Sequence, residues 1–137
     1  MSLFNVFDIA GSGMSAQTVR LNTTASNISN ADTVSSSVEQ TYRARHPVFA
    51  TAMQEQMGQA VAGVEVKGVV ESNAPLKHQY NPDHPMADEN GYVYYPNVNV
   101  IEEMANMMSA SRSYETNVQI INTSKQLMTQ TLQLGGG

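Results

Sequence analysis

Two stretches of the chain, one near each end, carry hydrophobic residues at a seven-residue spacing. In the first stretch, from Leu3 to about Ile28, one apolar set consists of Phe7, Met14, Leu21 and Ile28. A second set begins with Leu3 and Ala10 but is interrupted by the polar residues Gln17 and Thr24. Heptad spacing places such residues on one face of an α-helix, and no alternation of period two competes with it. The sequence therefore predicts an amphipathic helix here.

The C-terminal stretch, from Val98 to about Leu134, repeats more regularly. One set consists of Val100, Met107, Tyr114, Ile121 and Met128, and an interleaved set consists of Met104, Ser111, Val118, Lys125 and Leu132. No glycine or proline interrupts the stretch before Gly135, so we expect one helix of about 35 residues, roughly 50 Å long. Asn97 or Asn99 can cap its start, and Glu102 and Glu103 lie in the first turn, where the helix dipole favours anions.

A helix of this length is too long for the core of a 137-residue globule and needs a partner stripe. The N-terminal heptad offers that stripe. We therefore predict a mainly α fold in which long N- and C-terminal helices pair as an antiparallel coiled coil, with both termini at the same end. The expected segments are an N-terminal helix (1–33), a central segment (34–96) and a C-terminal helix (97–137). The expected interaction residues at the helix seam are Phe7, Met14, Leu21, Ile28, Val100, Met104, Met107, Tyr114, Val118, Ile121, Met128 and Leu132.

The central segment has a different character and contains all five prolines of the chain. The runs 64–66 and 69–70 are rich in valine and suggest a strand that is interrupted at Gly68. Asn90-Gly91 is a turn signal of the tight-hairpin kind, and the tyrosine-rich run 92–95 that follows it is typical of a strand. We therefore expect a small β-containing insert between the two helices.

The composition narrows the function. Charged residues make up 14% of the chain, well below the roughly 25% of average soluble proteins, so the surface offers little repulsion between copies. The net charge of −5, with only seven scattered Lys and Arg residues, argues against nucleic-acid binding. No apolar run approaches 18 residues, so no direct membrane insertion is expected. The first basic residue is Arg20, and we therefore expect no cleaved secretory signal.

Candidates for chemistry are few. The three histidines are His46, His78 and His84, and only the last two lie near acidic residues. Their spacing, with Pro82 between them, does not enforce the convergence of three or four ligands that a metal requires. The chain has no cysteine, and neither a nucleophile elbow nor a phosphate-cradling glycine loop is present. We expect no catalytic residues, no metal and no cofactor, and hence no enzyme.

Both ends of the chain resemble the axial rod, hook and filament proteins of the bacterial flagellum. The run 25–33, ASNISNADT, is similar to that family's N-terminal motif, and 96–104, PNVNVIEEM, is similar to the start of its C-terminal helix. Arg112, Tyr114 and Asn117 continue its Arg-x-Tyr-x-x-Asn pattern. Three further features narrow the resemblance to the proximal rod proteins: the start at Leu3-Phe4-Asn5, the chain length and the run 85–93. Thr33 is followed by Val34-Ser35 where many relatives have a Gly-Tyr step.

The resemblance implies a structural subunit that packs paired terminal helices into an inner tube, while the central segment faces outward. It implies a place in the flagellar basal body, reached without a cleaved signal peptide through the flagellum-specific export apparatus. The implied partners are further copies of the chain, the rod proteins FlgB, FlgF and FlgG, and FliE at the rod base. The alternative is a coiled-coil adaptor that binds a heterologous helical partner without polymerising.

Overall fold

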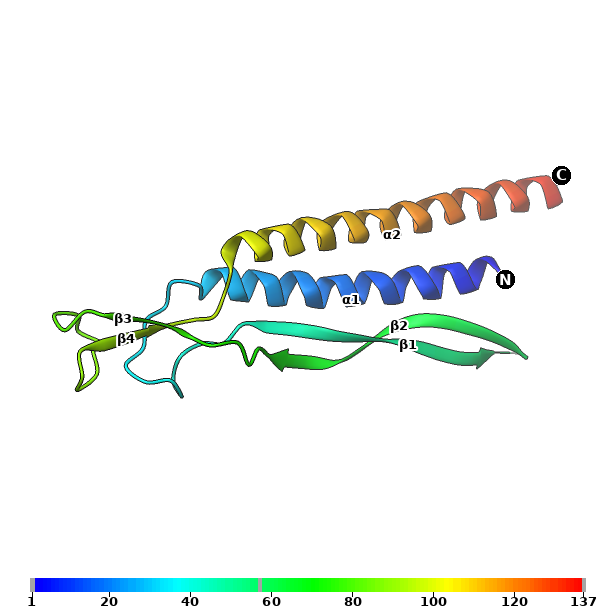
Figure 1. Cartoon of the computed structure of the whole chain (residues 1–137). Helices are drawn as coiled ribbons and strands as arrows, with labels where there is room; N and C mark the ends of the chain where they lie inside the picture. The colour runs from blue at the N-terminus through cyan, green and yellow to red at the C-terminus, as the bar shows by residue number, and fades with distance from the viewer. Residues whose placement is uncertain (1, 57, 137) are drawn as a thin grey trace.

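A computed structural model describes residues 2–56 and 58–136 of the chain. Figure 1 shows the elements in chain order: α1 (Leu3–Ser29), β1 (Arg45–Gln56), β2 (Gln59–Glu71), β3 (Lys77–Tyr80), β4 (Tyr92–Tyr95) and α2 (Val100–Gly135). None of the helices in the described part of the chain is both long and apolar enough to cross a membrane.

The elongated body consists of three layers. α1 lies in the middle, with α2 along one side and the hairpin formed by β1 and β2 along the other (Figure 1). The two helices are antiparallel, and both termini lie at the same end of the molecule, as the sequence predicted. The short β3–β4 sheet forms the opposite end (Figure 1).

Both helices begin at a side-chain cap. The Ser2 hydroxyl accepts a hydrogen bond from the amide of Asn5 at the start of α1. At α2 the side chain of Asn99 accepts from the amide of Glu102, so Asn99, and not Asn97, is the N-cap. Each cap satisfies one of the backbone amides that a helix start leaves without an intrahelical partner.

The β1–β2 hairpin is long and antiparallel, with Thr51 paired to Val64 and Ala52 paired to Gly63. The register shifts between Val48 and Phe49. Val48 pairs with Gly68 and Phe49 pairs with Val66, so β2 has one extra residue between these two pairs. The strand predicted around Val64 is therefore present, and the expected interruption at Gly68 is a β-bulge within it.

The β3–β4 sheet is closed by a loop rather than by a tight turn. The strand predicted over 92–95 is confirmed, but β3 ends at Tyr80 and the whole of 81–91 connects it to β4. Gly91 adopts φ +83°, and a Cβ there would lie 2.8 Å from the ring of Tyr80. A glycine is needed at this position, but the two-residue hairpin expected at Asn90-Gly91 does not form.

The chain is mostly α-helical with a β-containing segment between its two helices, as predicted, but the prediction that the helices pair as an antiparallel coiled coil beside only a small β insert is wrong. α1 divides its surface between α2 and a hairpin whose strands hold 12 and 13 residues, against 27 residues in α1 itself. The fully buried residues of α1 are Ala10, Ala16, Thr24 and Asn27, and those of α2 are Glu103, Ala110 and Ser124. A coiled coil would bury large apolar residues along its seam, whereas small and polar residues are buried here. The heptad pattern predicted that each helix has an apolar face, but it did not predict that the hairpin covers part of α1.

Candidate assembly surface

The contact between α1 and α2 is close and partly polar. A Cβ added to Gly13 would lie only 2.9 Å from the Nδ2 atom of Asn117, so the helices approach closely at this point. Further along, the guanidinium of Arg20 donates to the Oδ1 atom of Asn106 at 3.1 Å. From Gly13 to Arg20 the residue number rises along α1, whereas from Asn117 to Asn106 it falls along α2. The two contacts therefore fix the antiparallel register of the helices. Thr24, the polar residue that interrupts the second heptad set, is buried in the fold.

Ser12 joins α1 to the hairpin. Its hydroxyl donates to the carbonyl of Ile9 within α1 at 2.7 Å and accepts from the amide of Val64 on β2 at 3.0 Å. Gly63 lies directly beside it, since a Cβ there would stand 3.0 Å from the Ser12 hydroxyl oxygen. The absence of a side chain at Gly63 therefore lets β2 lie close to the Ser12 side chain of α1.

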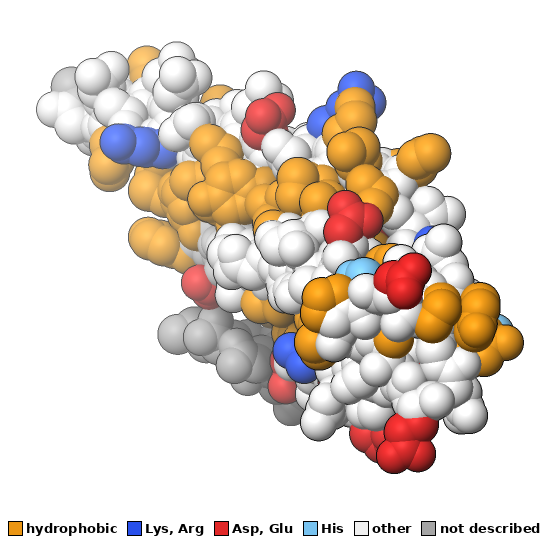
Figure 2. All heavy atoms as spheres, turned by 90° about the vertical axis from the view of Figure 1, so that its left-hand side faces the viewer, with side chains coloured by type: hydrophobic (Ala, Val, Ile, Leu, Met, Phe, Trp, Pro, Cys, Tyr) orange, Lys and Arg blue, Asp and Glu red, His pale blue; other side chains and the backbone are white. Residues whose placement is uncertain are grey.

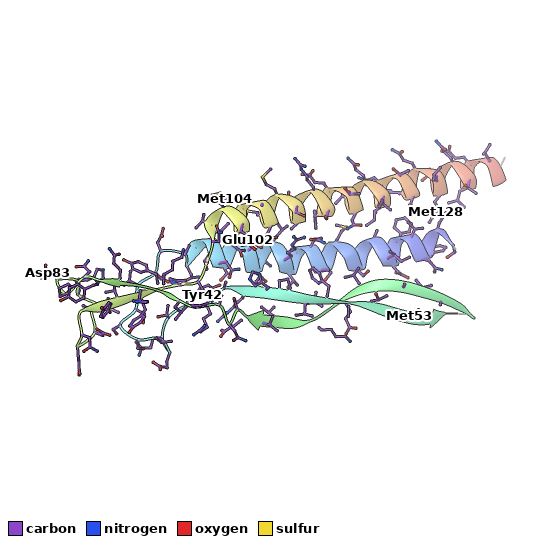
Figure 3. All side chains as sticks on the ribbon, in the orientation of Figure 1. Tyr42, Met53, Asp83, Glu102, Met104 and Met128 are labelled. Atoms are coloured by element: carbon purple, nitrogen blue, oxygen red, sulfur yellow. The ribbon has the colours of Figure 1, made fainter. Side chains whose placement is uncertain are left out.

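A buried asparagine ties the end of α1 to the start of β1. Asn27 is 0% exposed, and its Nδ2 atom donates to the carbonyl of Arg45 at 2.8 Å. Its Oδ1 atom accepts from the Arg45 amide at 2.9 Å and from the Tyr42 hydroxyl at 2.8 Å. The Arg45 guanidinium lies 5.4 Å from the centre of the Tyr42 ring, close enough for a cation–π interaction. Figure 3 shows Tyr42 where the helices meet the β-structure.

A second asparagine holds the same segment from the other side. The Oδ1 atom of Asn97 accepts from the Ala44 amide at 2.8 Å, and its Nδ2 atom donates to the carbonyls of Ser72 and Ala74 at 3.3 and 2.9 Å. Asn97 thus joins three segments, the start of β1, the segment after β2 and the approach to α2. The sequence analysis considered Asn97 only as a possible helix cap and gave Asn27 no role. The feature that could have pointed to them is that each terminal motif contains one of these asparagines.

The twelve residues predicted for the helix seam lie in two environments. Met104 and Leu132 are more than half exposed, and Figure 3 shows Met104 on the helix that forms one outer layer. The other ten are half-buried: Phe7, Met14, Leu21, Ile28, Val100, Met107, Tyr114, Val118, Ile121 and Met128. None of the twelve belongs to the fully buried set. A single chain therefore leaves part of this apolar surface open to solvent. Whether the twelve residues form an assembly seam stays a prediction.

Part of the open apolar surface can be seen from the β3–β4 end of the molecule. Figure 2 shows a stripe of hydrophobic side chains that runs back along the helices from the β3–β4 end, with few charged side chains along it. On α2 the exposed large hydrophobic residues are Ile101, Met104, Met108, Ile120, Leu127, Leu132 and Leu134. Exposed apolar surface on this scale is typical of a protein that packs against other protein molecules.

The histidines do not converge. His46 is on β1, His78 is on β3 and His84 is in the loop 81–91, where its Nδ1 atom accepts from the amide of Met86. His78 packs edge-on against the ring of Tyr92 at a centroid distance of 5.7 Å. Among the described residues no group of three or more His, Cys, Asp or Glu side chains could hold a metal ion.

Asp88 organises the β3–β4 end. Its Oδ1 atom accepts from the amides of Asn90 and Tyr92, and its Oδ2 atom accepts from the Tyr94 hydroxyl at 3.3 Å. Desolvation, followed by the nearby Asp88 carboxylate, raises the pKa of the Tyr94 hydroxyl above its ordinary value of 10.0. The backbone of Tyr94 also exchanges two hydrogen bonds with Ser35, which anchors the segment after α1 to β4.

Comparison with known proteins covers both motif regions. Residues 7–34 match the family described as "Flagella basal body rod protein", and residues 89–134 match "Flagellar basal body rod FlgEFG protein C-terminal". The chain is 53% identical over 135 residues to the flagellar basal-body rod protein FlgC of Salmonella typhimurium, covering 98% of this chain and 99% of that protein. With the same coverage it is 52% identical to FlgC of Escherichia coli O157:H7 and 51% identical to FlgC of Yersinia enterocolitica. The chain therefore belongs to the FlgC family of flagellar basal-body rod proteins, which are structural subunits of the rod.

Proposed function

We propose that the chain polymerises with other rod proteins into the proximal part of the axial tube that transmits torque and lets later subunits pass through its lumen. The observation that carries this proposal is the apolar surface of α2 that the chain itself leaves open. Ile101 is 80% exposed and Leu134 is 87% exposed, at opposite ends of the helix. Copies that bury this surface against one another gain about 25 cal/mol for each Å² removed from water.

Our proposed partners are further copies of the chain, FlgB, FlgF and FlgG along the rod, and FliE at its base. The chain reaches them through the flagellar export apparatus without a cleaved signal peptide, and it carries out no catalysis. Coupled folding and binding suits this route, because helices with open apolar faces become fully ordered only when neighbours cover them.

The test is deletion of the gene in its motile host, followed by a motility assay and electron microscopy of isolated basal bodies. We expect rings without a completed rod, and restoration of the rod by a plasmid copy. Normal basal bodies and normal swimming in the deletion strain would overturn the proposal.

An adaptor for a heterologous helix is the competing function, and solution behaviour separates the two. An adaptor forms a defined oligomer or a defined complex with its partner. A rod subunit alone stays monomeric until it meets the growing rod. Sedimentation of the purified chain distinguishes these outcomes, and a stable closed oligomer would favour the adaptor.

A further inference from the structure

The loop 81–91 ends in a turn that contains a reactive dipeptide. Asn90 is exposed, and it is followed by Gly91, which is buried. In an Asn-Gly sequence the backbone nitrogen of the glycine can attack the side-chain amide of the asparagine, because glycine has no side chain that hinders the approach. Asn90-Gly91 is the only Asn-Gly sequence in the chain.

The chemistry of this attack needs only water as a co-reactant. The Gly91 nitrogen loses its hydrogen and forms a bond to the Cγ atom of Asn90, while the side-chain nitrogen of Asn90 leaves as ammonia and a succinimide ring closes. Water then opens the ring at either of its carbonyls, which gives aspartate or isoaspartate at position 90. The nucleophile is therefore a backbone nitrogen, and its freedom to react depends on the fold.

Hydrogen bonds of the turn hold this nitrogen. The Gly91 amide donates to the carbonyl of Asp88 at 3.0 Å. The Oδ1 atom of Asp88 accepts from the amides of Asn90 and Tyr92 at 2.9 and 2.8 Å, and the Asp88 amide donates to the carbonyl of Tyr92 at 2.8 Å. Attack on Cγ requires the Gly91 nitrogen to give up its bond to Asp88, and the other three bonds oppose the movement that this needs.

Close packing restricts Gly91 further. A Cβ at Gly91 would lie 2.8 Å from the ring of Tyr80 and 3.1 Å from the Cβ atom of Pro82. The Gly91 carbonyl accepts from the amide of Asn81 at 2.9 Å. The amide and the carbonyl of Gly91 are thus both bonded to the backbone of the same loop, so this residue cannot rotate unless the β3–β4 end opens.

We infer that Asn90 is a deamidation site that the folded turn closes, so that the chain is modified there only while the β3–β4 end is open. Exposure of Asn90 gives water access, whereas the bond from Gly91 to Asp88 withholds the nucleophile. A backbone amide that is held in this way becomes free through local opening, at a frequency set by the free energy of that opening. The inference concerns the single chain and does not depend on assembly into a rod.

The modification would damage the same end of the molecule. Isoaspartate adds an extra carbon atom to the main chain at position 90. Two hydrogen bonds between Asp88 and Tyr92 span this position, one from the Asp88 amide and one to the Asp88 carboxylate. The added atom changes the spacing of both pairs, so a chain that is modified before it folds should close the β3–β4 end poorly.

The test incubates the purified wild-type chain at one pH in buffer and in urea, with circular dichroism to verify the folded and unfolded states. Mass spectrometry of proteolytic peptides measures aspartate and isoaspartate at position 90. We expect deamidation in urea and a rate roughly tenfold lower or less in buffer, because the turn must open first. Asn90→Gln should remove the product in urea. Equal rates in buffer and urea, or no deamidation of Asn90 in urea, would overturn the inference.

Two substitutions of Asp88 test whether the turn itself protects Asn90. Both remove the charge, but Asp88→Asn keeps an oxygen that can accept from the amides of Asn90 and Tyr92, whereas Asp88→Ala does not. In buffer we expect deamidation several-fold faster in Asp88→Ala than in Asp88→Asn, and equal rates in urea. The control is Asp83→Ala, an exposed position that Figure 3 shows at the tip of the same end, and it should keep the wild-type rate. Equal rates of the two Asp88 variants in buffer would contradict protection by the turn.

Discussion

Asn27 and Asn97 accept hydrogen bonds from consecutive backbone amides, those of Arg45 and Ala44. Asn27 belongs to α1 and Asn97 precedes α2, so one short segment is held by side chains from both ends of the chain. Backbone groups that are buried without a partner cost free energy, and these two amides receive theirs from side chains. The two terminal motifs thus meet at the start of β1.

Asn27→Ala should lower the free energy of unfolding by about 2–4 kcal/mol, because it removes the partner of the Arg45 backbone amide and carbonyl and leaves the Tyr42 hydroxyl with the Ser26 hydroxyl alone. Thermal or denaturant unfolding followed by circular dichroism measures the loss. Asn22→Ala is the matched control, since Asn22 is an exposed asparagine of the same helix. Equal effects of the two substitutions would show that the Asn27 contacts contribute nothing.

The terminal helices were predictable because their signal is local. The observed bounds of α1 and α2 lie within about two residues of those expected from the heptads, and the anionic first turn of α2 is present. The resemblance of the terminal motifs to flagellar axial proteins also identified the family correctly.

The packing was not predictable in the same way, because it depends on contacts between distant residues. The approach of Gly13 to Asn117 has no periodic signature. Thr24 is buried at a heptad position, but its polar side chain suggested an interruption of the apolar set. The length of the hairpin was hidden because residues such as Met53 and Val64 make its outer face apolar and remove the alternation that indicates a strand. The long hairpin, which the sequence pattern did not reveal, adds a third layer to the two helices that were expected.

Two glycines of α1 should respond differently to alanine. A Cβ at Gly11 meets nothing within 4 Å, so Gly11→Ala should stabilise the chain by about 1 kcal/mol through helix propensity. Gly13→Ala should gain less, because its Cβ presses on the Asn117 side chain. Unfolding of both variants measures the difference. In an Asn117→Ala background the difference should disappear; if it persists, the close contact is not its cause.

Val118→Asp should block rod assembly. Val118 is half-buried in the single chain, and an unpaired carboxylate at a packed seam costs several kcal/mol, on the order of 3–5. Motility and electron microscopy of basal bodies measure the effect. Gln119→Asp is the control, because it introduces the same charge at the exposed neighbouring position. Wild-type motility of Val118→Asp would remove Val118 from the seam.

Replacing His78 and His84 together with alanine should leave motility unchanged. Among the described residues, 2–56 and 58–136, neither imidazole belongs to a cluster of side chains that could bind a metal ion. Swimming in soft agar and metal analysis of purified chain provide the measurement. Loss of motility accompanied by loss of a stoichiometric metal would show that the histidines form a site.

Tyr94 should lose its proton at a higher pH than an ordinary tyrosine does. Desolvation and the Asp88 carboxylate both disfavour the phenolate, so the pKa of Tyr94 lies above its ordinary value of 10.0. A group that binds its proton more tightly in the folded state stabilises the fold below its unfolded pKa. This contribution is therefore complete below about pH 10 and disappears as the pH rises through the higher folded pKa.

Ultraviolet absorbance of tyrosinate during alkaline titration checks this behaviour, and Tyr94→Phe should remove the late component from the six tyrosines. Asp88→Asn should move that component towards lower pH, since it removes the charge but keeps an oxygen that can accept from the amides of Asn90 and Tyr92. If Asp88→Asn leaves the late component in place, the Asp88 carboxylate has no part in raising the pKa of Tyr94.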